Sequence, residues 1–167
     1  MSTLRTKDGY EKQLHDFMSV ILIVCPSCAG QAIIKSDGKT PSKETEANIK
    51  VVCTKCGYNK SLSAQPDTLL NQSSRKSIKG KIMITGAPID PYFHFPLWLT
   101  TPCCDNLLWA YNFEHLDFLH QHVETKLRER NTVETYNKAI ASRLPKWMTS
   151  KKNRFLVLKS IANLKAK

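Results

Sequence analysis

The chain has 167 residues, of which 41% are hydrophobic, 23% are charged and only 6 are glycine, a composition that excludes a wholly disordered protein. Its length allows one domain with a core, or a small metal module joined to a second small domain. The net charge of +11 is uneven, because residues 126–167 carry 12 basic and 2 acidic side chains whereas the rest carries 13 and 12.

We expect neither a membrane span nor a secretory leader in this sequence. Its longest apolar run, residues 20–24, is far shorter than the roughly 20 residues that cross a bilayer. The residues before this run mix both charges, and no small-residue cleavage site follows it. We therefore expect a cytoplasmic protein without a membrane partner.

The first part of the chain is predicted to be β-rich. Residues 1–19 form an N-terminal segment whose last apolar side chains have helical spacing, which predicts a short helix. Residues 19–25 are rich in Val and Ile and predict a strand, with residues 32–35 as its hairpin partner. After a polar excursion over residues 36–48, residues 48–53 predict another strand.

Each of these two apolar strands leads into a Cys-x-x-Cys pair, Cys25-Pro26-Ser27-Cys28 or Cys53-Thr54-Lys55-Cys56. Each pair lets two sulfurs converge on one ion across a tight turn, and structural zinc prefers a closed shell of four such ligands. We therefore predict one structural Zn²⁺ held by Cys25, Cys28, Cys53 and Cys56. The alternative of a redox dithiol normally needs a βαβ context, which the predicted elements lack.

The motifs Cys25-Pro26-Ser27-Cys28 and Cys53-Thr54-Lys55-Cys56-Gly57-Tyr58 resemble the zinc-ribbon superfamily, in particular the transcription-factor-IIB-type ribbons found in many bacterial proteins. The resemblance covers about residues 20 to 63. One residue departs from the pattern, since Ala29 stands where many ribbons have glycine directly after the second cysteine.

Two later stretches extend this resemblance. Residues 108–112 with residues 114–116, and residues 141–147, are similar to stretches of uncharacterised bacterial proteins that carry such a ribbon. The resemblance implies an architecture for the chain but no activity.

The middle of the chain is predicted to leave the ribbon and return to β structure. Residues 67–81 are polar and then basic, which is typical of a linker, and residues 81–85 predict a strand. Residues 86–96 contain three prolines and therefore cannot form a helix. Two apolar runs, residues 97–101 and 107–111, flank a turn and predict a β-hairpin.

The period of the apolar residues becomes helical in the last part of the chain, residues 113–167. Three stripes predict three helices: Leu116, Leu119, Val123 and Leu127; Val133, Tyr136, Ile140 and Leu144; and Val157, Leu158, Ile161 and Leu164. Asn131 with Glu134 forms a capping signal for the second helix, Pro145 ends it, and Ser150 is predicted to cap the third.

These elements predict an α+β fold. It consists of a small β-rich four-cysteine zinc ribbon and a β-hairpin region, followed by a C-terminal bundle of about three helices. The expected segments are 1–19 (N-terminal segment), 20–66 (zinc ribbon), 67–81 (linker), 82–112 (β-hairpin region) and 113–167 (basic helical region).

Basic residues crowd the junction of the last two predicted helices, with a tryptophan among them. This mixture is expected where phosphates meet an aromatic platform. The predicted surface for nucleic acid, or for an acidic protein partner, consists of Arg143, Lys146, Trp147, Lys151, Lys152 and Arg154.

No stretch of the chain indicates catalysis. Cys103-Cys104 has no further donors that would complete a second metal site, and we assign it no role. His115, His120 and His122 do not form a His-Glu-x-x-His motif, and Glu124-Thr125-Lys126 lacks the strand-borne aspartate of a nuclease. A four-thiolate zinc site has no open coordination position for hydrolysis. We therefore expect no enzymatic activity and no small-molecule substrate.

Three functions follow, in order of preference. The first is a non-enzymatic zinc protein that binds nucleic acid through its basic C-terminal helices. The second is a protein-interaction adaptor, or a small subunit of a bacterial assembly, which docks on an acidic protein. The third is a thiol-based or hydrolytic enzyme.

Overall fold

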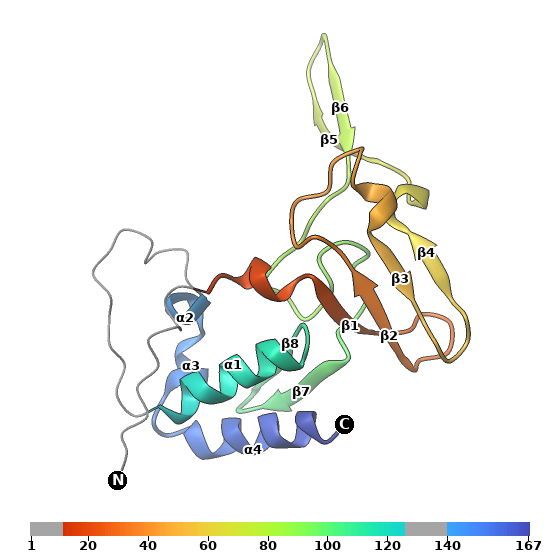
Figure 1. Ribbon diagram of the computed structural model, residues 1–167. Coiled ribbons are helices and arrows are strands. Elements are labelled where there is room, and N and C mark those ends of the chain that lie inside the picture. Colours follow the sequence, from red (N-terminus) through yellow and green to blue (C-terminus); the bar gives the residue numbers. More distant parts are fainter. Residues whose placement is uncertain (1–11, 126–139) are drawn as a thin grey trace. The chain divides into compact units, whose positions relative to one another are not determined.

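The structure is a computed structural model, and it describes residues 12–125 and 140–167 (Figure 1). The described residues divide into two compact units, one of residues 18–98 and one of residues 12–17, 99–125 and 140–167. The described residues form small antiparallel sheets followed by helices, which confirms the predicted α+β class.

A four-stranded antiparallel sheet forms the base of the unit of residues 18–98. Its strands lie in the order β1 (Val20–Val24), β2 (Gln31–Lys35), β3 (Lys50–Val52) and β4 (Asn59–Ser61). The register aligns Ile21, Ile34 and Val51 in one row across three strands, and all three side chains are fully buried. Cross-strand rows of β-branched side chains stabilise a sheet, so this row fixes which face of the sheet is inside.

The polar segment after β2 contains the 3₁₀ turn η3 (Glu46–Asn48). A second 3₁₀ turn, η4 (Leu62–Ala64), directly follows β4. Each turn buries one side chain of its own, Glu46 or Leu62.

The proline-rich segment of this unit folds around a buried carboxylate. Asp90 is fully buried and accepts hydrogen bonds from the backbone N–H groups of Tyr92 (2.9 Å), Phe93 (2.7 Å) and Phe95 (2.6 Å). Burial raises the pKa of Asp90, and the three N–H groups compensate for the lost hydration of the carboxylate. The segment is not helical, as predicted.

The prediction of a strand over residues 81–85 was wrong. The N–H of Ile84 donates to the carbonyl of Pro91 (3.2 Å) rather than to a neighbouring strand. Residue 81 is a lysine whose side chain is buried in an ion-pair network, which fixes the chain here without a sheet partner.

A two-stranded hairpin, β5 (Thr68–Gln72) with β6 (Ser77–Gly80), occupies the segment predicted to be a linker. Figure 1 shows that it projects from the rest of its unit. All five side chains of β5 are exposed, and so are those of Ser77, Ile78 and Lys79 in β6. This hairpin is not predicted from the sequence, because strands without a buried face lack the apolar alternation by which strands are recognised.

The other unit contains the β-hairpin that was predicted over residues 97–111. It pairs β7 (Leu99–Cys103) with β8 (Asn106–Ala110). Its two-residue turn is Cys104-Asp105, and both residues have positive φ, 52° and 58°. Positive φ at both turn residues matches the right-handed twist of the strands, although neither residue is glycine.

The helix α1 (Phe113–Glu124) follows this hairpin directly. Its N-cap is Asn112, whose side chain accepts a hydrogen bond from the N–H of His115 (2.8 Å). Leu116, Leu119 and Val123 form its buried stripe, as predicted from their spacing. The 3₁₀ helix η2 (Leu14–Phe17) packs here, with Phe17 stacked on His115, and takes the place of the predicted short N-terminal helix.

The described residues 140–167 contain three helices: α2 (Ile140–Arg143), α3 (Lys146–Thr149) and α4 (Arg154–Lys165). α4 packs against α1 and β7 and buries Val157, Ile161 and Leu164. Most of the predicted second helix, with its cap at Asn131, lies outside the described residues.

The prediction that Ser150 caps the last helix was wrong. α4 begins three residues later, after Asn153, and Ser150 ends α3 instead. The carbonyl of Ser150 accepts a hydrogen bond from the N–H of Asn153 (3.2 Å), which turns the chain between the two helices.

Candidate metal centre

The two Cys-x-x-Cys turns have the same backbone hydrogen bonds. In the first, the N–H of Cys25 donates to the carbonyl of Gly30 (2.7 Å), and the N–H of Ala29 donates to that of Cys25 (2.9 Å). In the second, Cys53 donates to Tyr58 (2.8 Å), and Gly57 donates to Cys53 (3.0 Å). The chain therefore builds one turn twice, at the ends of β1 and β3.

The residue after the second cysteine of each turn has a left-handed conformation. Gly57 has φ +75°, and Ala29 has φ 56°. The departure of Ala29 from the ribbon pattern therefore changes the residue but not the backbone shape. A Cβ at the next residue, Gly30, would lie 3.0 Å from Lys55 Cδ and 3.3 Å from Cys28 Sγ, so a larger residue there would require the Lys55 side chain to shift.

The four sulfur atoms converge on one point. Cys25 Sγ lies 3.7 Å from Cys56 Sγ, Cys28 Sγ lies 3.7 Å from Cys53 Sγ, and all four lie within 4.8 Å of one another. A tetrahedral ion with metal–sulfur bonds of about 2.3 Å separates its sulfurs by about 3.8 Å. The four cysteines therefore form a group that can bind a metal ion, and its dimensions fit a tetrahedral thiolate shell.

The electrostatics of the thiols also favour a cation. A hydrogen bond from the backbone N–H of Tyr58 lowers the pKa of Cys56 to about 7. The N–H of Gly30 acts in the same direction on Cys28, but partial burial and the neighbouring sulfurs outweigh it and raise the pKa of Cys28 to about 11. Four crowded sulfurs cannot all ionise without a counter-charge, which a divalent cation supplies.

The predicted basic surface lies on one short stretch of the unit that contains α1 and α4. Arg143 ends α2, Lys146 and Trp147 begin α3, Lys151 and Lys152 lie in the following turn, and Arg154 begins α4. These residues lie within twelve consecutive positions of the sequence, and the side-chain amide of Asn153 donates a hydrogen bond to the carbonyl of Trp147 (2.9 Å).

An aromatic residue that the sequence analysis missed lies beside this stretch. Phe155 is 74% exposed on the first turn of α4, and Leu156 is 50% exposed next to it, whereas Trp147 is half-buried. The predicted helical stripe of α4 includes Val157 and Leu158 as inward-facing residues. The same spacing places Phe155 on the outward-facing side, so this stripe is the sequence signal for its exposure.

Among residues 12–125 and 140–167, the remaining cysteines and histidines form no second metal group. The sulfurs of Cys103 and Cys104 lie 3.6 Å apart without a third donor among these residues. His115 is buried, and burial lowers its pKa to about 3. His120 lies 3.6 Å from Glu124, one turn along the same helix.

Within the described part of the chain, no helix combines the length and the apolar character that a membrane crossing requires. Comparison of the chain with protein-family models, with curated proteins and with solved structures gave no match.

Proposed function

We propose that the chain is a non-enzymatic protein in which one structural Zn²⁺ stabilises the ribbon and the basic C-terminal helices bind nucleic acid. Zinc is the ion that closed four-thiolate tetrahedral sites in proteins most commonly hold. The sulfur separations of 3.7 Å support this choice, and four thiolates leave no position for a reacting water.

The charge of the described C-terminal residues carries the nucleic-acid proposal. Residues 140–167 contain eight basic side chains and no acidic one. Exposed helices that serve only as solvated surface usually mix both signs, whereas a one-sign surface attracts phosphate.

Binding of fluorescent nucleic acids at several salt concentrations tests this proposal. For the variant K151Q/K152Q/R154Q, we expect weaker binding and a slope of log K against log[salt] that is shallower by about 2 to 3. The variant K35Q/K39Q/K50Q removes the same charge from exposed positions of the other unit and should change the slope less. Equal effects of the two variants would mean that only the net charge matters, and binding that does not depend on salt would overturn the proposal.

A second candidate function is docking on an acidic protein, and the exposed pair Phe155 and Leu156 favours it. Purification from the host with and without nuclease separates the two functions. A stoichiometric protein partner that survives nuclease, and that F155A/L156A releases, would favour docking over nucleic-acid binding.

A further inference from the structure

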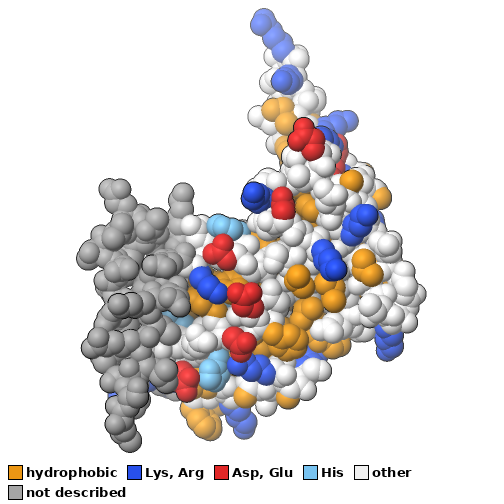
Figure 2. All heavy atoms as spheres, in the orientation of Figure 1, with side chains coloured by type: hydrophobic (Ala, Val, Ile, Leu, Met, Phe, Trp, Pro, Cys, Tyr) orange, Lys and Arg blue, Asp and Glu red, His pale blue; other side chains and the backbone are white. Residues whose placement is uncertain are grey.

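The outer part of the β5–β6 hairpin carries only side chains that hydrogen bond or bear positive charge. Residues 71–77 are Asn-Gln-Ser-Ser-Arg-Lys-Ser, and all seven are exposed. Lys79 adds a further exposed positive charge, and no acidic residue occurs from position 68 to position 80. Figure 2 shows the basic side chains at the outer end of the hairpin and hydrophobic ones nearer its base.

The strand register sorts these side chains by face. Gln72 pairs with Ser77, and Leu69 pairs with Lys79. Since Ser77 and Lys79 are two positions apart, they lie on the same face of the ribbon together with their partners. An amide, a hydroxyl and an ammonium group therefore share this face of the ribbon with the apolar side chain of Leu69. These groups contact base edges and phosphates in nucleic acids.

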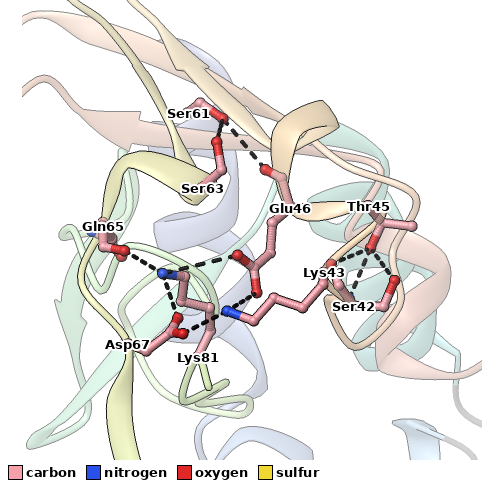
Figure 3. A network of polar contacts seen from close by, with 9 residues as sticks. All are labelled: Ser42, Lys43, Thr45, Glu46, Ser61, Ser63, Gln65, Asp67 and Lys81. Atoms are coloured by element: carbon pink, nitrogen blue, oxygen red, sulfur yellow. Dashed lines mark hydrogen bonds and ion pairs between the residues drawn. The ribbon is translucent and has the colours of Figure 1, made fainter. Parts of the chain in front are cut away.

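The base of the hairpin is held by a network of ion pairs that joins its two ends (Figure 3). Lys81, directly after β6, lies 2.9 Å from Asp67, directly before β5, and it also donates to the carbonyl of Gln65. Lys43 lies 2.5 Å from Asp67, and the buried Glu46 lies 3.7 Å from Lys43 and 3.9 Å from Lys81. The hairpin is therefore anchored to the body of its unit at both ends.

From these observations we infer that the β5–β6 hairpin enters the major groove of duplex DNA, as a second nucleic-acid contact in addition to that of the C-terminal helices. The inference rests on the proposed function, and it names B-form duplex DNA as the ligand. The major groove is about 12 Å wide and admits a two-stranded ribbon.

The composition of the hairpin argues against three other ligands. The major groove of A-form RNA is too narrow and deep for side chains to read. A membrane-inserting tip would carry apolar or aromatic side chains, whereas the exposed apolar residues Leu69, Leu70 and Ile78 lie outside the turn at residues 73–76. An acidic protein would match the positive charge of the hairpin, but that charge match alone would not use the amide and hydroxyl groups that lie beside it.

Fluorescence anisotropy with a 30-base-pair DNA duplex, an RNA duplex of the same sequence and single-stranded DNA tests the inference on the full zinc-loaded chain. The test variant is R75Q/K76Q, and the matched control is K39Q/K50Q, which removes two exposed positive charges elsewhere in the same unit. We expect R75Q/K76Q to bind the DNA duplex about tenfold more weakly, with a salt slope shallower by about 2. Unchanged zinc content and circular dichroism show that the variants are folded.

The outcomes separate this inference from the proposed function. Duplex binding that R75Q/K76Q does not weaken beyond the control overturns the hairpin inference and leaves the C-terminal helices as the binding site. Binding to single strands or to RNA alone also overturns it. If the chain binds no nucleic acid, both are wrong, and loss of a purified protein partner in R75Q/K76Q would then assign the hairpin to protein docking.

Discussion

Lys81 Nζ lies 2.9 Å from Asp67 Oδ1, and these two residues stand at the two ends of the projecting hairpin. Only 6% of the Lys81 side chain is exposed, and its second carboxylate partner, Glu46, is 7% exposed. A buried ammonium group between two carboxylates is stable only while all of them are present. The pair therefore fixes where the hairpin leaves the body of its unit.

Replacement of Lys81 by methionine tests this anchor. Lys81→Met leaves the buried carboxylate of Glu46 with Lys43, whose side chain is largely exposed to water, as its one remaining ion-pair partner among the described residues. We expect a loss of about 2 to 4 kcal/mol in the free energy of unfolding, measured by urea denaturation. Lys43→Met is the control, because the Lys43 side chain is 64% exposed and its ion pairs are screened by water. Equal losses in the two variants would contradict a special role for Lys81.

In the two cysteine turns, exchanging alanine and glycine is expected to change the stability in opposite directions. An alanine in the left-handed conformation costs roughly 1 to 2 kcal/mol, and Ala29→Gly removes this cost. The greater conformational entropy of glycine in the unfolded chain offsets about 0.4 to 1 kcal/mol of that gain. We therefore expect zinc-loaded Ala29→Gly to be more stable by about 0.5 to 1 kcal/mol and Gly57→Ala to be less stable by a similar amount. No atom lies within 4 Å of a Cβ at position 57, so the strain there comes from φ alone. Thermal unfolding that shifts in the same direction for both variants would contradict this explanation.

Buried His115 makes stability depend on pH. Its ring accepts the N–H of Tyr111 at Nδ1 (3.2 Å), and burial lowers its pKa to about 3. The unfolded chain has the ordinary pKa of about 6.5 and binds the proton first, so this contribution to stability is complete above pH 6.5 and is lost as the pH falls toward 3. We expect a loss of up to about 1.4 kcal/mol per pH unit in that interval.

The variant His115→Asn isolates this effect, because the asparagine oxygen can accept the same N–H but does not titrate. Urea denaturation at pH 7, 6 and 5 should show wild type and variant converging as the pH falls. A stability difference that stays constant over this range would mean that His115 is not the titrating group.

Much of the fold follows from local patterns in the sequence. The cysteine spacing predicts the two turns, and the Val- and Ile-rich runs predict the strands that place Ile21, Ile34 and Val51 in one row. The apolar runs over residues 97–101 and 107–111 predict the β7–β8 hairpin, and the structure places its two-residue turn at Cys104-Asp105. The turn residues themselves do not follow from the sequence, because Cys104 adopts the left-handed conformation that the sequence rule expects for Asn, Asp or Gly.

Other features depend on contacts that local patterns do not contain. Lys43 and Lys81 are 38 positions apart, and nothing in either neighbourhood indicates that both approach Asp67. The β5–β6 hairpin has no buried face, so its strands lack the alternation that reveals a strand. The exposure of Phe155 follows from helical periodicity only once the start of α4 is known.

The binding of one zinc ion by Cys25, Cys28, Cys53 and Cys56 is tested most directly by native mass spectrometry of freshly purified, reduced protein. We expect one zinc per chain, loss of that zinc in Cys56→Ser, and retention of it in Cys103→Ser, the control cysteine outside the cluster. Less than one zinc per chain, together with a Cys25–Cys28 disulfide that forms readily in air, would contradict the metal site and indicate a redox dithiol instead.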